Sequence, residues 1–110
     1  MLFAAVHFAE NQDAVLPGAH PILEMAARAL REHLKVGPVH LLGWADAREG
    51  GAAGLRLSAR RAAVVRDYLV ACGIDPCRLV AAAHRSAQQE RCPDSEAARA
   101  EHRRVEIHVD

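Results

Sequence analysis

Short apolar runs alternate with two longer segments of helical period, and this alternation limits the folds open to the chain. Apolar residues in the longer segments recur every three or four positions, the spacing of one face of an α-helix. The short runs are rich in Val, Leu and Ile and are bounded by turn-forming residues, which is typical of β-strands. The pattern predicts strands at 2–8, 39–42, 79–82 and 103–109, helices at 19–35 and 58–72, and a helical turn at 95–100.

Both predicted helices carry end signals. Gly37-Pro38 follows the first helix and ends it, because proline cannot continue a helix. Ser58 is the expected N-cap of the second helix, since its hydroxyl can accept a hydrogen bond from a free backbone N–H, and Gly73 is the expected C-cap. This order of elements predicts an α/β sandwich, with one mixed four-stranded sheet packed against two main helices.

The chain is short and electrically balanced. Its 110 residues fit one domain, residues 1–110, and its two Phe, one Trp and one Tyr imply a core built mainly from Val, Leu and Ile. Fourteen Lys and Arg balance fourteen Asp and Glu, so the net charge does not indicate a nucleic-acid partner. No run of 18 apolar residues is present, so we expect no direct membrane insertion, and the first residues lack the basic region of a signal peptide.

The segment 43–54 is rich in glycine and alanine and contains three charged residues, Asp46, Arg48 and Glu49. Small residues without helical or strand period predict an irregular loop. Because glycine lets a backbone come close to a bound molecule, this loop is the candidate ligand-binding segment.

Three motifs occur in an order that resembles a known family. Gly43-Trp44-Ala45-Asp46 is followed by Leu57-Ser58-Ala59-Arg60-Arg61-Ala62 and, near the end, by Arg103-Arg104-Val105-Glu106-Ile107. Together they resemble the OmpA-like C-terminal domain, a family that includes the peptidoglycan-associated lipoprotein and the stator protein MotB. The resemblance implies a non-catalytic domain of the periplasm or cell envelope that binds peptidoglycan non-covalently and anchors an envelope protein to the cell wall.

The resemblance also implies the ligand contacts. In the family, the Asp of the first motif meets the ammonium end of meso-diaminopimelate in the stem peptide, and the second Arg of the helix motif meets its carboxylate. These positions are Asp46 and Arg61. With Ser58 as the cap, Arg61 is expected in the first helical turn, where a cation opposes the helix dipole and therefore favours an anionic partner. The alternative is that Asp46 and Arg61 pair with each other and close the loop.

Some positions depart from the family pattern. Ala45 stands where the family commonly has Thr, Gly54 stands where it usually has an Asn that supports the ligand loop, and the turn after the third strand is replaced by residues 82–85. These departures lower the expected ligand affinity and favour a second hypothesis, a degenerate OmpA-like fold that serves as a protein-interaction or homodimerisation domain. A small cytosolic α/β domain unrelated to the cell wall is a third hypothesis.

Two further side chains are candidates for the same site. Trp44 could stack on a glycan or peptide, although a single Trp at a strand end more often fills the core. Arg104 either contacts ligand or pairs with an acid such as Glu106 or Asp46. Because Arg103 and Arg104 are adjacent in a strand, they face opposite sides and at most one of them can reach the site.

The remaining residue types do not form a recognisable catalytic or metal pattern. The seven His and three Cys lack the spacings of a metal site, so we expect no metal, no cofactor and no enzymatic activity. If the domain is exported, a disulfide between Cys77 and Cys92 is plausible, with Cys72 left in the helix; the alternative is three free thiols.

Overall fold

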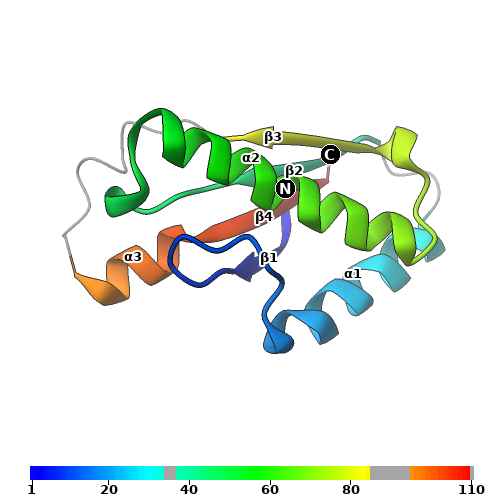
Figure 1. Ribbon diagram of the computed structural model, residues 1–110. Coiled ribbons are helices and arrows are strands. Elements are labelled where there is room, and N and C mark those ends of the chain that lie inside the picture. The colour runs from blue at the N-terminus through cyan, green and yellow to red at the C-terminus, as the bar shows by residue number, and fades with distance from the viewer. Residues whose placement is uncertain (34–36, 85–94, 110) are drawn as a thin grey trace.

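The computed structural model describes residues 1–33, 37–84 and 95–109. Its sheet has the strand order β1-β4-β2-β3 (Figure 1). Strands β2 and β3 are parallel, whereas β4 runs antiparallel to both β1 and β2. The mixed four-stranded sheet predicted from the sequence is therefore confirmed. The strands are β1 (Leu2–His7), β2 (Val39–Gly43), β3 (Leu79–Ala83) and β4 (Arg104–Val109).

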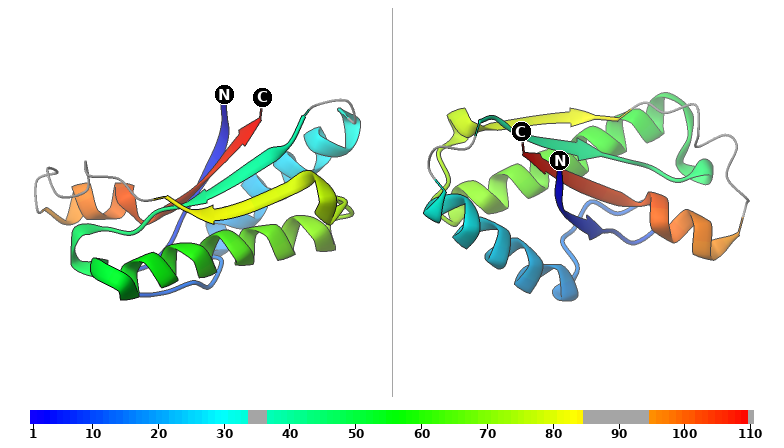
Figure 2. Two further views of the ribbon diagram at one scale, coloured as in Figure 1. Left: turned by 90° about the horizontal axis from the view of Figure 1, so that it is seen from above. Right: turned by 180° about the vertical axis from the view of Figure 1, so that it is seen from behind.

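Two long helices pack on one side of the sheet (Figures 1 and 2). Helix α1 (His20–Glu32) follows a short 3-10 helix, η1 (Pro17–Ala19), and helix α2 (Gly51–Ala71) connects the parallel strands β2 and β3. A short helix, α3 (Glu96–His102), leads into β4 and confirms the helical turn predicted at 95–100. Two further 3-10 helices are η2 (Ala47–Glu49) and η3 (Pro76–Arg78).

The core lies between the sheet and the helices. In β4 the side chains alternate, with Val105, Ile107 and Val109 buried in the core and the intervening residues half-buried on the opposite face. This alternation persists in a central strand because the opposite face of the sheet carries neither long helix. Each fully buried Val or Ile contributes about 1.5–3 kcal/mol to folding. Helix α1 contributes the apolar stripe predicted from its spacing: Leu23, Ala26, Ala27 and Leu30.

Helix α2 passes very close to the end of β2. A Cβ on Gly43 would lie 1.9 Å from the carbonyl oxygen of Ser58, a separation that real Cβ atoms essentially never have. Glycine is therefore required at the last residue of β2, and its absence of a side chain sets the distance between helix and sheet. The close approach brings Ser58 of α2 directly against the last residue of β2.

The predicted start of the second helix is wrong. Helix α2 begins at Gly51 with Gly50 as its N-cap, so Ser58 lies inside the helix, where its Oγ donates to the carbonyl oxygen of Gly54 at 2.8 Å. Ala52 and Ala53 are strong helix formers, and they extend the helix into the segment predicted as a loop.

Candidate functional site

The site begins at the turn after β2, where Asp46 caps the 3-10 helix η2. The Oδ1 atom of Asp46 accepts hydrogen bonds from the backbone N–H groups of Arg48 at 2.8 Å and Glu49 at 3.0 Å. In return, the Glu49 carboxylate accepts from the backbone N–H of Asp46 at 3.0 Å, which completes a capping box. The spacing Asp-x-x-Glu is the sequence signal for this contact, although Glu49 is not among the site residues predicted from the sequence.

Arg61 is the most deeply buried charged residue of the site, with 0% of its surface exposed. A guanidinium has five N–H donors, and each of them is used. Nε donates to the carbonyl oxygen of Gln12 at 2.9 Å, and Nη1 and Nη2 donate to the carbonyl oxygens of Trp44 and Ala9, each at 3.1 Å. The remaining two N–H groups hold Glu49 in a bidentate pair, at 2.8 and 2.7 Å.

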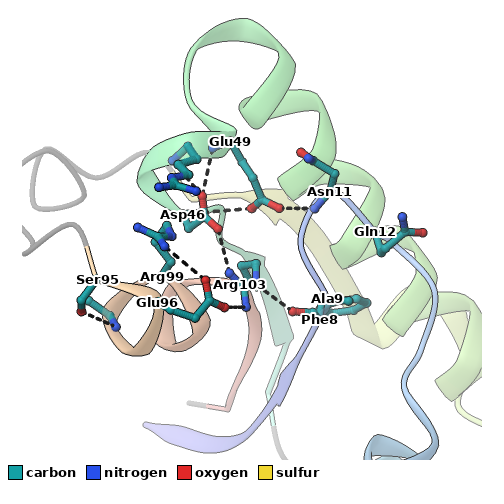
Figure 3. A network of polar contacts seen from close by, with 12 residues as sticks. Phe8, Ala9, Asn11, Gln12, Asp46, Glu49, Ser95, Glu96, Arg99 and Arg103 are labelled. Atoms are coloured by element: carbon teal, nitrogen blue, oxygen red, sulfur yellow. Dashed lines mark hydrogen bonds and ion pairs between the residues drawn. The ribbon is translucent and has the colours of Figure 1, made fainter.

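The Glu49 carboxylate is consequently held by four donors. Oε1 accepts from Arg61 and from the backbone N–H of Asp46, and Oε2 accepts from Arg61 at 2.7 Å and from the backbone N–H of Asn11 at 2.6 Å. Figure 3 shows the carboxylate between Asp46 and Asn11. Burial alone would raise the pKa of Glu49, but these hydrogen bonds outweigh it and hold the pKa below its ordinary value of 4.5. Glu49 is therefore an ionised, buried carboxylate at neutral pH.

Asn11 reaches this position through an unusual backbone conformation. Its φ is 57°, in the left-handed region that asparagine tolerates better than most residues. In this conformation its backbone N–H donates to Oε2 of Glu49 at 2.6 Å. The loop after β1 therefore supplies one of the four donors.

Gly54 has a steric role in this arrangement. A Cβ at position 54 would lie 1.4 Å from the carbonyl oxygen of Glu49, so only glycine allows the Glu49 backbone to pack against α2. Gly54 stands where the family usually has an Asn. In this chain the glycine makes room for the backbone of Glu49, whose side chain points into the site.

Asp46 and Arg61 have different ionic partners. The Oδ2 atom of Asp46 accepts from Nη1 of Arg103 at 3.1 Å, and Arg103 also binds Glu96 of α3 at 2.8 Å and the carbonyl oxygen of Phe8 at 3.1 Å (Figure 3). Arg61 pairs instead with Glu49. The alternative in which Asp46 and Arg61 pair directly is therefore wrong. So is the expectation of Arg61 in the first helical turn, because α2 begins ten residues earlier, at Gly51.

Trp44, Ala45 and Arg104 lie on the flank of the site. Trp44 is only 7% exposed and Ala45 is also buried, although neither belongs to the main hydrophobic core cluster. The indole stacks on His84 with 3.9 Å between ring centroids, and the guanidinium carbon of Arg104 lies 3.9 Å from the indole centroid. Arg104 also pairs with Glu106 at 2.8 Å, which confirms one of the two acids predicted as its partner.

Other sequence predictions concern groups outside this network. Within residues 1–33, 37–84 and 95–109, no cluster of three or more His, Cys, Asp or Glu is arranged to hold a metal ion. Across the same part of the chain, none of the helices has the length and apolar character needed to cross a bilayer. Cys72 is half-buried at the end of α2 and Cys77 is exposed in η3, but Cys92 lies outside the described residues, so the disulfide stays a prediction.

Comparison with known proteins identifies the family. The family model described as the OmpA family matches residues 7–104. The fold is similar to the peptidoglycan-associated lipoprotein of Burkholderia pseudomallei, with a TM-score of 0.84 and 23% identity over 96% of this chain and 89% of that one. It is also similar to the C-terminal domain of Helicobacter pylori MotB, with a TM-score of 0.82 and 22% identity over 98% of this chain and 84% of that one.

A third similar structure is the OmpA-like domain of FopA1 from Francisella tularensis, with a TM-score of 0.77 and 17% identity over 94% of this chain and 68% of that one. Among curated proteins, no sequence matches significantly. Identities this low show a shared fold, whereas the family model spans most of the sequence. The chain belongs to the OmpA family.

Proposed function

We propose that this domain binds peptidoglycan non-covalently in the periplasm or cell envelope and anchors the protein that carries it to the cell wall. Its similarity to a peptidoglycan-associated lipoprotein supports the general activity. The observation that supports the proposal is the convergence of four N–H donors on one carboxylate, that of Glu49, because the same donors could bind the carboxylate of a ligand. The domain acts by binding alone and carries out no chemical reaction.

In this proposal the ligand is the meso-diaminopimelate of the stem peptide. Its carboxylate binds Arg61 in place of Glu49, and its ammonium binds the Asp46 carboxylate, whose Oδ2 accepts from Arg103. Trp44, Ala45 and Arg104 form the adjoining wall, where their packing fixes the position of the β2 end rather than offering an exposed aromatic face. The carboxylate and the ammonium of the diaminopimelate are thus bound by Arg61 and Asp46, respectively, in a largely dehydrated site.

The test is an NMR titration of the domain with meso-diaminopimelate and with a soluble muropeptide. We expect saturable amide shifts at Asn11, Asp46 and Glu49. The binding-deficient control is the double variant Arg61→Met/Glu49→Met, because replacing a buried ion pair by apolar residues of similar volume commonly preserves folding. The matched control is Arg60→Ala, since Arg60 is exposed and pairs with Asp13 at the surface. Equal shifts in the double variant would refute the assignment of the site.

A second candidate function is protein interaction or dimerisation on a degenerate fold. It is favoured by the observation that all five N–H donors of Arg61 and both carboxylate oxygens of Asp46 already have partners within the chain. A folded wild-type domain that shows no shifts at millimolar muropeptide, and that self-associates in sedimentation experiments, would support this candidate over peptidoglycan binding.

A further inference from the structure

The carboxylate-binding site of this domain is filled by one of its own side chains. Arg61 and the backbone N–H groups of Asp46 and Asn11 point their donors at a single carboxylate, and that carboxylate is Glu49. Both side chains of the ion pair are essentially unexposed, at 0% for Arg61 and 1% for Glu49. From this geometry we infer that Glu49 is an internal occupant of a carboxylate receptor, and that an external carboxylate reaches Arg61 only by displacing it.

The donors belong to segments that are far apart in the sequence. Asn11 follows β1, Asp46 follows β2, and Arg61 lies within α2. Arg61 is further fixed by the carbonyl oxygens of Ala9 and Gln12, so its orientation does not depend on Glu49 alone. Removing the Glu49 side chain would therefore leave four donors still directed at one space.

The space lies close to the surface. Asn11 and Gln12 on one side and Arg48 and Gly50 on the other are all exposed, so the carboxylate of Glu49 lies beneath two surface loops. We therefore expect a small anion to reach these donors once the Glu49 side chain has been truncated. The inward position of Glu49 depends in turn on Gly54, whose missing Cβ makes room for the Glu49 carbonyl oxygen.

The inference can be tested without peptidoglycan. Truncation by Glu49→Ala deletes one methylene carbon and the carboxyl group beyond Cβ, and acetate supplies one carbon and one carboxyl group. Acetate can therefore replace the missing atoms one for one, whereas chloride cannot bridge the four donors and propionate is one carbon too large. A ligand that binds only the folded state stabilises it, and the stabilisation grows with the logarithm of the ligand concentration once that concentration exceeds Kd. The melting temperature rises accordingly.

The experiment is thermal unfolding of Glu49→Ala in sodium acetate, propionate and chloride at equal ionic strength. We expect the variant to melt below the wild type in chloride and to recover by several degrees in acetate, with a smaller effect of propionate. The wild type and the double variant Arg61→Met/Glu49→Met should show only the small general effect of acetate relative to chloride, well below the recovery of Glu49→Ala. If Glu49→Ala is folded and shows no specific response to acetate, the inference is overturned.

If Glu49→Ala is unfolded in chloride, refolding from urea in acetate replaces the melting experiment. Folding that depends on acetate supports the receptor, and an equally unfolded chain in both salts refutes it. Glu49→Gln provides a second variant of nearly the same shape. It keeps the space filled, so it should be destabilised without recovering in acetate, and recovery would contradict the proposed fit.

That a peptidoglycan carboxylate displaces Glu49 rests on the proposed function, and it is tested separately by titrating both proteins with muropeptide. If Glu49 competes with the ligand, Glu49→Ala should bind muropeptide at least tenfold more tightly than the wild type. Acetate recovery without any muropeptide binding in either protein would support the receptor and refute the proposed function. Equal muropeptide binding by both proteins, without acetate recovery, would support the function and refute the role of Glu49.

Discussion

Substitution of Gly54 by alanine gives the sharpest test of how this site is built, because two physical arguments predict opposite signs. Alanine within a helix is normally more favourable than glycine by about 1 kcal/mol. Helix propensity alone therefore predicts that Gly54→Ala stabilises the domain. The structure predicts the reverse, since the added Cβ would lie 1.4 Å from the carbonyl oxygen of Glu49.

The size of the destabilisation depends on which atoms must move to make room for the new Cβ. The obstructing atom belongs to the backbone, so a side-chain rotation cannot relieve the contact, and the turn carrying Glu49 has to shift away from α2. Overpacking of this kind costs about 1–3 kcal/mol. Separating a buried ion pair costs about 3–5 kcal/mol when it is complete. The shift of the turn only partly separates Glu49 from Arg61, so only part of the ion-pair cost applies. After subtraction of the gain in helix propensity, we expect a loss of about 2–4 kcal/mol in the free energy of unfolding.

Urea unfolding followed by circular dichroism measures this loss through the midpoint and the slope. The matched control is Gly18→Ala, because a Cβ at position 18 meets no atom within 4 Å and its φ is not left-handed. The control should lie within about 0.5 kcal/mol of the wild type. If Gly54→Ala is as stable as the wild type, the close packing of Glu49 against α2 is not required, and the account of the site fails.

Two further predictions use neighbouring groups. Arg61→Ala should lower the free energy of unfolding by about 3–5 kcal/mol, because it leaves the Glu49 carboxylate buried without its cation. The exposed control Arg60→Ala should lower it by no more than about 1 kcal/mol. Equal losses for the two variants in urea unfolding would contradict the assignment of the buried pair. Stability should also fall with acidification. Burial lowers the pKa of His84 below 6.5, so the unfolded chain binds more protons there and stability declines as the pH falls through that range. The pKa of Glu49, held below 4.5, adds a second decline under more acidic conditions, and a free energy of unfolding that stays constant from pH 7 to pH 3 would refute both assignments.

Much of the fold was predictable from local patterns. The four strands, the helix at 20–32 and the short helix before β4 follow from periodicity and turn residues, and the structure contains each of them. Local rules work here because period-two and period-3.6 patterns report directly which side of an element is buried. The family motifs also placed Asp46 and Arg61 in one region of the molecule.

The start of α2 was missed because two local signals compete. Ser58 is a good N-cap residue, but Ala52 and Ala53 favour helix before it. The added part of the helix carries Gly54, whose missing Cβ lets the Glu49 carbonyl oxygen pack against it. Asp46 provides the cap of the preceding turn, which the Asp-x-x-Glu spacing could have indicated.

By itself, the sequence determined the fold class, the family and the presence of a carboxylate and a guanidinium near the end of β2. Only the tertiary structure decided their partners. Asp46 is bound by Arg103, which lies 57 residues further along the chain, and Arg61 of α2 is bound by Glu49 of the turn after β2. The reason is physical: a buried charge takes whichever opposite charge the packed chain brings within hydrogen-bond distance, and that distance is not encoded in residue spacing.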